Sequence, residues 1–150
     1  MGKKFILLSP NGKYIFCNYS NSLYSENNGK HTLIWNNTSI FGYAYCQFFP
    51  NSDQIALYDG NNFMIKNCID MSTVLSYNLN GETFINVDFN TNNLLTYTNN
   101  TFKIYDVSTG SLIKTIPTSS AGFSSTIDLL FNNYLISDLG YEFNINMTKK

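Results

Sequence analysis

The chain has 150 residues, a length that matches one ordinary domain. Hydrophobic residues make up 43% of it, aromatic residues 16% and charged residues only 13%, which is too apolar a composition for a disordered segment. The formal net charge is −1 and all nine basic residues are lysine, so the bidentate arginine fork that reads guanine and phosphate is absent and we expect no nucleic-acid partner.

Short strand-like segments follow one another along the whole chain. Alanine is scarce, no long window carries apolar residues at helical spacing, and β-branched and aromatic residues dominate every apolar run. Turn sequences such as Asn-Gly, Asp-Gly and Ser-Thr-Gly separate these runs at intervals of about ten residues. The sequence therefore predicts an all-β chain, a meander of antiparallel strands joined by tight turns.

The apolar runs fall into four successive groups. The first three groups each predict four strands, and the fourth predicts three strands with no outer strand after them. In chain order, the strands are expected at residues 5–8, 13–18, 22–26, 32–36, 42–49, 54–58, 63–67, 74–77, 84–89, 93–97, 102–106, 112–116, 127–131, 134–137 and 141–145.

A repeat of about 40 residues underlies the four groups. Pro10 and Pro50 are 40 residues apart, and so are Phe49 and Phe89, while Phe131 follows 42 residues later. A second marker keeps the same register, with intervals of 40, 39 and 41 residues between its members, which are Leu23, Phe63, Phe102 and Phe143. A period of about 40 to 45 residues with four short strands in each unit is typical of β-propeller blades.

The third group carries a resemblance to WD40 repeats. Its segment 102–116 is similar to the third and fourth strands of such a repeat, and Tyr105-Asp106 stands where the family has Trp-Asp. The hairpin at 9–13 resembles the family less strongly, and the second group resembles it weakly. No Gly-His dipeptide precedes any group, and the only histidine, His31, lies elsewhere. We therefore expect that the family's polar tetrad cannot be assembled and that apolar packing between blades supplies most of the cohesion.

The resemblance implies a single WD40-like propeller segment over residues 1–150, with repeats at about 5–36, 42–77, 84–116 and 127–146. These repeats amount to about three and three-quarter blades, whereas a closed propeller needs at least about four. The edge of the last blade and the face of the first blade would then lie open. Either the chain is a fragment of a longer propeller, or a second copy or a different subunit supplies the rest.

No grouping of reactive residues accompanies the repeats. Gly-x-Ser-x-Gly, phosphate-binding loops and Cys-x-x-Cys are all absent, so we expect no catalytic, cofactor-binding or metal-binding residues and no enzyme activity. The only pair that could act as nucleophile and base is a cysteine with His31. We expect His31 to be an exposed turn residue and therefore not part of such a pair. Cys17, Cys46 and Cys68 lie in apolar strand-like runs and are expected to be buried free thiols.

Acidic and aromatic residues are assigned structural roles. The carboxylates fall mostly at strand ends and turns, where they cap backbone amides, and Asp59-Gly60 predicts a hairpin turn rather than a calcium loop. The recurring aromatic residues are expected in the core, and Trp35, in an outer strand, is the best candidate for a partly exposed contact. The carboxylates assigned to these roles are Asp53, Asp59, Asp70, Glu82, Asp88, Asp106, Asp128 and Asp138. The core aromatic residues are Phe16, Phe48, Phe84, Phe89, Phe102 and Tyr105.

Asparagine is abundant, which together with the lysine-only basic residues indicates an AT-rich genome. Such a composition produces glycosylation sequons by chance, so we expect no glycans at Asn18, Asn36, Asn37, Asn99 or Asn146. The opening residues lack a secretory apolar region, and no apolar run approaches the roughly 20 residues that cross a bilayer. We therefore expect a soluble, cytoplasmic chain with no membrane partner.

Three hypotheses about function remain. The first is a non-catalytic scaffold, a propeller segment that presents loops to protein partners within a larger assembly. The alternative is part of an enzyme or of a carbohydrate-binding propeller whose functional residues lie outside this chain. The third is a self-completing oligomer in which two chains close one ring of about eight blades.

Overall fold

The structure is a computed structural model that describes residues 5–38, 42–51, 53–118, 127–132, 134–137 and 142–145. Fifteen β-strands lie within these residues, and they form four antiparallel sheets. The chain divides into two compact units, Met1–Asn78 and Leu79–Lys150.

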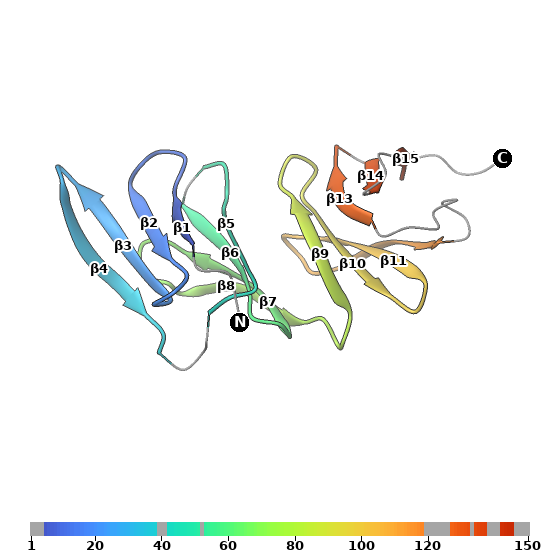
Figure 1. Cartoon of the computed structure of the whole chain (residues 1–150), viewed down its shortest axis with the longest axis horizontal. Helices are drawn as coiled ribbons and strands as arrows, with labels where there is room; N and C mark the ends of the chain where they lie inside the picture. Colours follow the sequence, from blue (N-terminus) through green and yellow to red (C-terminus); the bar gives the residue numbers. More distant parts are fainter. Residues whose placement is uncertain are drawn as a thin grey trace. The chain divides into compact units, whose positions relative to one another are not determined.

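The first unit holds two four-stranded sheets (Figure 1). Each strand pairs with the next along the chain, so both sheets are meanders. The strands of the first sheet are β1 (Ile6–Leu8), β2 (Tyr14–Cys17), β3 (Ser22–Asn27) and β4 (Lys30–Asn36). Those of the second sheet are β5 (Tyr45–Phe48), β6 (Gln54–Tyr58), β7 (Asn62–Asn67) and β8 (Thr73–Asn78).

The second unit holds a four-stranded and a three-stranded sheet, again with each strand beside the next (Figure 1). The four-stranded sheet consists of β9 (Thr83–Asp88), β10 (Asn93–Thr98), β11 (Thr101–Asp106) and β12 (Leu112–Pro117). The three-stranded sheet consists of β13 (Ile127–Phe131), β14 (Tyr134–Ser137) and β15 (Glu142–Asn144).

The predicted all-β meander is confirmed, and three strands, β6, β13 and β14, have the bounds expected from the sequence. The expected strand at 42–49 is too long, since β5 begins only at Tyr45, after two residues that bond to other parts of the unit. Lys30 and His31 belong to β4 rather than to the turn before it. The expectation that residues 146–150 form no outer strand lies outside the described part of the chain.

Asparagine provides most of the tight turns. A positive φ is costly for a residue with a Cβ atom, and asparagine tolerates it better than other such residues. Among the described non-glycine residues, eight have φ values between +46° and +58°, and all but Met71 are asparagine. These asparagines are Asn21, Asn28, Asn80, Asn92, Asn99, Asn100 and Asn132.

One backbone hydrogen bond recurs in each four-stranded sheet and closes the same end of it. The N–H of Glu26 donates to the carbonyl of Lys13 at 2.7 Å in the first sheet. The N–H of Cys68 donates to Asp53 in the second sheet and that of Val107 to Asn92 in the third, both at 2.9 Å. Each bond joins the start of the second strand to the end of the third, so the repeat seen in the sequence is also a repeat of backbone geometry.

An apolar core joins the two sheets of each unit. In the first unit, Phe16 and Leu23 of the first sheet and Ile55 and Leu57 of the second are all 0% exposed and belong to one cluster. In the second unit, residues of the third sheet such as Leu95 cluster with residues of the β14–β15 hairpin and its end, Leu135 and Ile145. The sheets within a unit are therefore stacked face to face, and the side chains of their inner faces form the core between them.

Candidate functional site

The first sheet has an exposed apolar face, which we call the open face. Successive side chains of a strand alternate between the two faces of its sheet, so alternate residues of β1 to β4 share this face. Leu8 lies opposite Ile15, which in turn lies opposite Tyr24. Tyr24 lies opposite Leu33, so one apolar row crosses all four strands. The apolar residues of the open face are Ile6, Leu8, Ile15, Cys17, Tyr24 and Leu33, and Ser22, Glu26 and His31 share the face.

Exposure distinguishes the two faces of this sheet. On the open face, Ile6 is 66% exposed, Leu8 69% and Leu33 52%. On the other face, Phe16 and Leu23 are fully buried against the second sheet. An antiparallel sheet that faces water normally carries polar residues on its outer face. An outer face lined with Ile, Leu and Tyr is instead typical of a surface that another protein element covers.

Asn18 holds the start of the second sheet to the first. Its side-chain oxygen accepts the N–H of Tyr43 at 2.9 Å, and its side-chain nitrogen donates to the carbonyl of Tyr43 at 3.1 Å. Gly42, just before, has φ +96°, a left-handed conformation that favours glycine, and a Cβ there would lie 3.4 Å from the Asn18 carbonyl oxygen, in van der Waals contact. Since the Asn18 amide is buried and bonded, the sequon at this position cannot carry a glycan in the folded chain.

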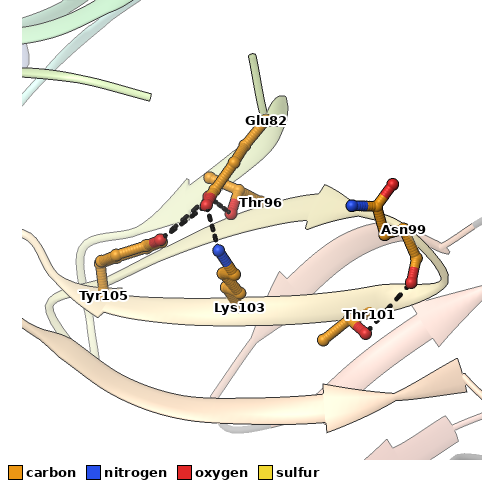
Figure 2. A network of polar contacts seen from close by, with 6 residues as sticks. All are labelled: Glu82, Thr96, Asn99, Thr101, Lys103 and Tyr105. Carbon is orange, nitrogen blue, oxygen red and sulfur yellow. Dashed lines mark hydrogen bonds and ion pairs between the residues drawn. The ribbon is translucent and has the colours of Figure 1, made fainter. Parts of the chain in front are cut away.

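A polar network centred on Glu82 links the residue just before β9 to the next two strands of the third sheet (Figure 2). The Glu82 carboxylate accepts the Thr96 hydroxyl at 2.6 Å and the Lys103 ammonium at 2.5 Å. The Tyr105 hydroxyl lies 3.0 Å from both carboxylate oxygens. Glu82 directly precedes β9, Thr96 lies on β10, and the other two residues lie on β11. The Glu82 carboxylate thus connects the segment before β9 to β10 and β11.

The network holds its members in defined protonation states. Burial alone would raise the pKa of Glu82, but the hydrogen bonds from Lys103, Thr96 and Tyr105 outweigh it and hold that pKa below its ordinary value. The hydrogen bond to Glu82 raises the pKa of Lys103. Burial, followed by the bond to Glu82, raises the pKa of Tyr105. Glu82 is therefore a carboxylate at neutral pH, with donors on both oxygens, and its arrangement stabilises the sheet rather than offering a free base.

The network corrects one expectation from the sequence. Glu82 was expected to cap a turn, yet its carboxylate bonds to side chains of two strands. Apolar packing was expected to supply most of the cohesion between blades, because no Gly-His dipeptide precedes a blade, and the Glu82 network does not test this expectation because it lies within one sheet. Gly81-Glu82 occupies the place just before β9 where that dipeptide would stand. Through its bonds with Thr96 and Tyr105, Glu82 attaches the segment before β9 to β10 and β11, with a glutamate in place of the family's histidine.

Most other described carboxylates cap turns, as predicted. Asp59 accepts the N–H groups of Asn61 and Asn62 at 2.9 and 2.8 Å, which confirms a hairpin turn. Asp70 accepts the Ser72 N–H, and Asp106 accepts those of Ser108 and Thr109, each at 2.9 Å.

Asp88 bridges two sheets of the second unit in addition to capping its own turn. One of its oxygens accepts the Asn90 N–H at 3.0 Å, and the other accepts the Asn132 N–H at 2.6 Å. Among the described residues, no capping bond from the Asp53 side chain is found; its backbone carbonyl makes the recurring bond described above. The predicted roles of Asp128 and Asp138 lie outside the described side chains.

The histidine and the cysteines are dispersed. His31 is exposed and lies opposite Glu26 within β4, so its expected place in a turn is wrong. Cys46 and Cys68 are buried free thiols, and burial raises the pKa of both, that of Cys68 to about 12. Cys68 lies in the turn after β7 rather than in a strand. Cys17 is only half-buried, and a hydrogen bond from Ser20 lowers its pKa.

The predicted core aromatic residues divide into two sets. Phe16, Phe48 and Phe102 are buried, which confirms their assignment to the core. Phe84, Phe89 and Tyr105 are half-buried. Trp35, the candidate for a partly exposed contact, is half-buried against the core of the first unit, on the face opposite the open face.

The described residues contain neither a cluster of metal ligands nor a helix that could cross a membrane. Across this part of the chain, no three His, Cys, Asp or Glu side chains lie close enough together to hold a metal ion. Nor does the described structure include a helix that is both long and apolar enough to cross a membrane.

Comparisons with known proteins give matches only at the level of structure. No family model matches the sequence, and no curated protein matches it. Among solved structures, 289 chains match. One is the β-propeller domain of Cps50 (Swd1) from Myceliophteria thermophila, with a TM-score of 0.63, 10% identity, and coverage of 88% of this chain and 48% of that one. Another is the WD40 repeats of RRP9, with a TM-score of 0.50, 13% identity, and coverage of 77% and 39%.

The chain spans less than half the length of either of these solved chains. At such low identity the likeness is one of fold, and it agrees with the repeat period, the four-stranded meanders and the face-to-face packing of the sheets. The sheets of this chain have the fold of β-propeller blades, as in these solved structures.

Proposed function

We propose that this chain is a non-catalytic protein-interaction scaffold, a propeller segment that works within a larger assembly or oligomer. The open face carries the proposal. Ile6, Leu8 and Leu33 are more than half exposed on one face of one sheet, and the register places Leu8 and Leu33 in a single row. Contiguous exposed apolar surface of this kind marks sites where proteins bind one another.

Three features support a non-catalytic role in the cytoplasm. Within the described residues, both carboxylate oxygens of Glu82 accept bonds from side chains of the same sheet. The three cysteines are free, as is usual in a reducing compartment. The chain has a formal net charge of −1 and no arginine, which disfavours nucleic acid as a partner.

The experiment compares the proteins that the chain retains from its own source cells when the open face is changed. The test variant is Leu8→Lys, and the matched control is Leu112→Lys, since Leu112 is a strand leucine that is 52% exposed outside the open face. Quantitative mass spectrometry should show proteins bound to the unchanged chain and to the control but lost from Leu8→Lys. Identical sets bound to all three would contradict the proposal, as would a catalytic turnover that depends on described residues.

A further inference from the structure

Three Asn-Gly dipeptides lie at exposed positions outside the strands, at 11–12, 28–29 and 80–81. Such a dipeptide can modify itself, because the backbone nitrogen of the glycine can attack the side-chain amide of the asparagine, and glycine has no side chain to obstruct the approach. The reaction requires the glycine N–H to give up its proton. A hydrogen bond from that N–H must therefore be broken first, so the reactivity of each dipeptide depends on whether its glycine N–H is engaged.

The first two dipeptides have an engaged glycine N–H. The Gly12 N–H donates to the Ser9 carbonyl at 2.9 Å, and the Gly29 N–H donates to Oε1 of Glu26 at 2.6 Å. A carboxylate that accepts such a bond stabilises the protonated nitrogen, because its negative charge repels the anion that loss of the proton would leave. Both dipeptides are thereby protected.

The third dipeptide shares the φ values of the second but lacks this bond. Asn28 and Asn80 have φ values of 51° and 52°, and the glycine that follows each has φ 79°. An added Cβ at either glycine would meet no described atom within 4 Å, so both turns are open to water. Within the described part of the chain, the Gly81 N–H donates no hydrogen bond. The two turns thus differ in the state of one N–H group.

We propose that Asn80-Gly81 is a self-modifying site, which converts without an enzyme into an isoaspartyl link. The Gly81 nitrogen loses its proton to water, and its electron pair forms a bond to Cγ of Asn80 while the side-chain amide leaves as ammonia. Water then opens the resulting cyclic imide. Opening at Cγ gives aspartate, and opening at the backbone carbonyl carbon gives isoaspartate, in which the main chain runs through the former side chain. The net change converts an amide and water into a carboxylic acid and ammonia.

The modified turn is the one that positions Glu82. The Glu82 N–H donates to the Leu79 carbonyl at 2.9 Å and closes the turn, and both residues are buried. The two central residues have a positive φ, as a type I′ turn requires. Isoaspartate adds a backbone atom inside this turn, which displaces Glu82 from Thr96 and Lys103. The modification therefore loosens the third sheet as the protein ages. It is independent of the open face and of the proposed function.

Peptide mass spectrometry of the unchanged chain, stored in mildly alkaline buffer, tests the site. The mass gain of an amide-to-acid conversion should appear at Asn80 about tenfold faster than at Asn28, and also faster than at Asn11. A methyltransferase specific for isoaspartate should label the same peptide. In urea, where the turns are not formed, the three rates should converge. An Asn80 rate no greater than that of Asn28, or a ranking that persists in urea, would overturn the proposal.

Glu26→Ala is the matched variant, because it frees the Gly29 N–H and lies outside the third sheet. Asn28 should then react at about the rate of Asn80, whose own rate should stay the same. Asn11, before another strand of the first sheet, is the internal control and should keep its slow rate. If Glu26→Ala leaves the Asn28 rate unaltered, the N–H bond does not set the ranking and the proposal fails.

The effect on the third sheet is measured on the modified chain itself. Ion exchange separates the aged, deamidated chain, which contains isoaspartate, from the unchanged chain. The variant Asn80→Asp carries the same added charge without the extra backbone atom. The aged chain should therefore unfold at a lower urea concentration than Asn80→Asp, and equal urea midpoints would show that the modification does not loosen the sheet.

Discussion

The two units fill the same position of the repeat in different ways. In the first unit, Gly42-Tyr43 precedes the β5 strand, and Tyr43 is held through its backbone by the Asn18 side chain of the preceding sheet. In the second unit, Gly81-Glu82 precedes β9, and Glu82 is held through its side chain by residues of its own sheet. Both glycines have a positive φ. A tether therefore occupies this position in both units, made by a side-chain amide to the backbone in the first unit and by a carboxylate to side chains in the second.

The two tethers differ in whether the groups that lose their partner can reach water. The Asn18 tether satisfies two buried backbone groups, and both Asn18 and Tyr43 are 2% exposed. The Glu82 tether includes Lys103, whose side chain is 29% exposed and can turn to water if its partner is removed. Unsatisfied buried groups cost more than groups that regain solvent. We therefore expect the first unit to depend more strongly on its tether than the second.

Removing the first tether should have the largest effect. Asn18→Ala leaves the N–H and carbonyl of Tyr43 without their partner, which should lower the free energy of unfolding by about 2 to 4 kcal/mol. Urea denaturation measures the change. Asn27→Ala, at an exposed position of β3, is the control and should stay within about 0.5 kcal/mol of the unchanged chain. Equal effects at the two positions would show that Asn18 is not a tether.

Neutralising the second tether should have a smaller effect. Glu82→Gln keeps the shape of the side chain but loses the charge that pairs with Lys103 and one acceptor, so we expect a loss of about 1 to 2 kcal/mol. The same change at Glu26, a partly exposed residue that caps the Gly29 N–H, is the matched control and should cost less than about 0.5 kcal/mol. A greater loss at Glu82 than at Asn18 would reverse the ranking of the two units.

Acid should weaken the second tether selectively. The pKa of Glu82 is lower in the folded chain than its ordinary value, so the unfolded chain takes up this proton at a higher pH than the folded chain does. The stability from Glu82 is therefore present above the ordinary pKa of about 4.3 and is lost as the pH falls through the lower folded pKa. Unfolding curves at successive pH values should show the unchanged chain losing more stability below that pH than Glu82→Gln. Parallel losses would assign the acid sensitivity to the capping aspartates alone, since Asp59, Asp70 and Asp106 also have lowered pKa values.

The smallest expected effect concerns the reaction rates of the cysteines with a thiol reagent. These rates report on local unfolding of the first unit and require no substitution at the cysteines. All three lie in the first unit, and Cys17 should react with a thiol reagent first, because it is half-buried and its pKa is lowered. Cys46 and Cys68 should react only when the first unit opens, because burial raises their pKa values. Their rates should rise in Asn18→Ala and stay unchanged in Glu82→Gln. A rise in both variants would mean that the two units open together.

The strands could be predicted from the sequence because their signals are local. Alternating apolar residues and Asn-Gly or Asp-Gly turns lie within a few residues of the element that they define, and β6, β13 and β14 follow the expected bounds. His31 was misplaced because Asn-Gly-Lys-His can be divided between turn and strand at more than one residue. The structure places the turn at Asn28 and Gly29, so β4 begins at Lys30.

The tethers could not be predicted in the same way, because their partners are remote. Asn18 and Tyr43 are 25 residues apart, and Glu82 and Tyr105 are 23 apart. Asn18 was considered only as a chance sequon, and Glu82 was placed among the turn caps. One local pattern indicates the second tether: Gly81-Glu82 lies just before β9, at the place where WD40 repeats, which this chain resembles, have Gly-His.

The left-handed asparagines have a consequence for how this chain can change over time. Glycine reaches a positive φ without strain but loses more conformational freedom on folding, whereas asparagine accepts a small strain and stiffens the unfolded chain. The two effects partly offset each other, so exchange between Gly and Asn at Asn28 should be close to neutral, whereas Asn92→Gly would also lose the bonds that the Asn92 amide donates to Asp106 and Ser108. A genome whose base composition favours asparagine codons can therefore replace glycine by asparagine in the turns without disturbing the strands. Sequence similarity at the turns then decreases while the architecture of the blades is retained.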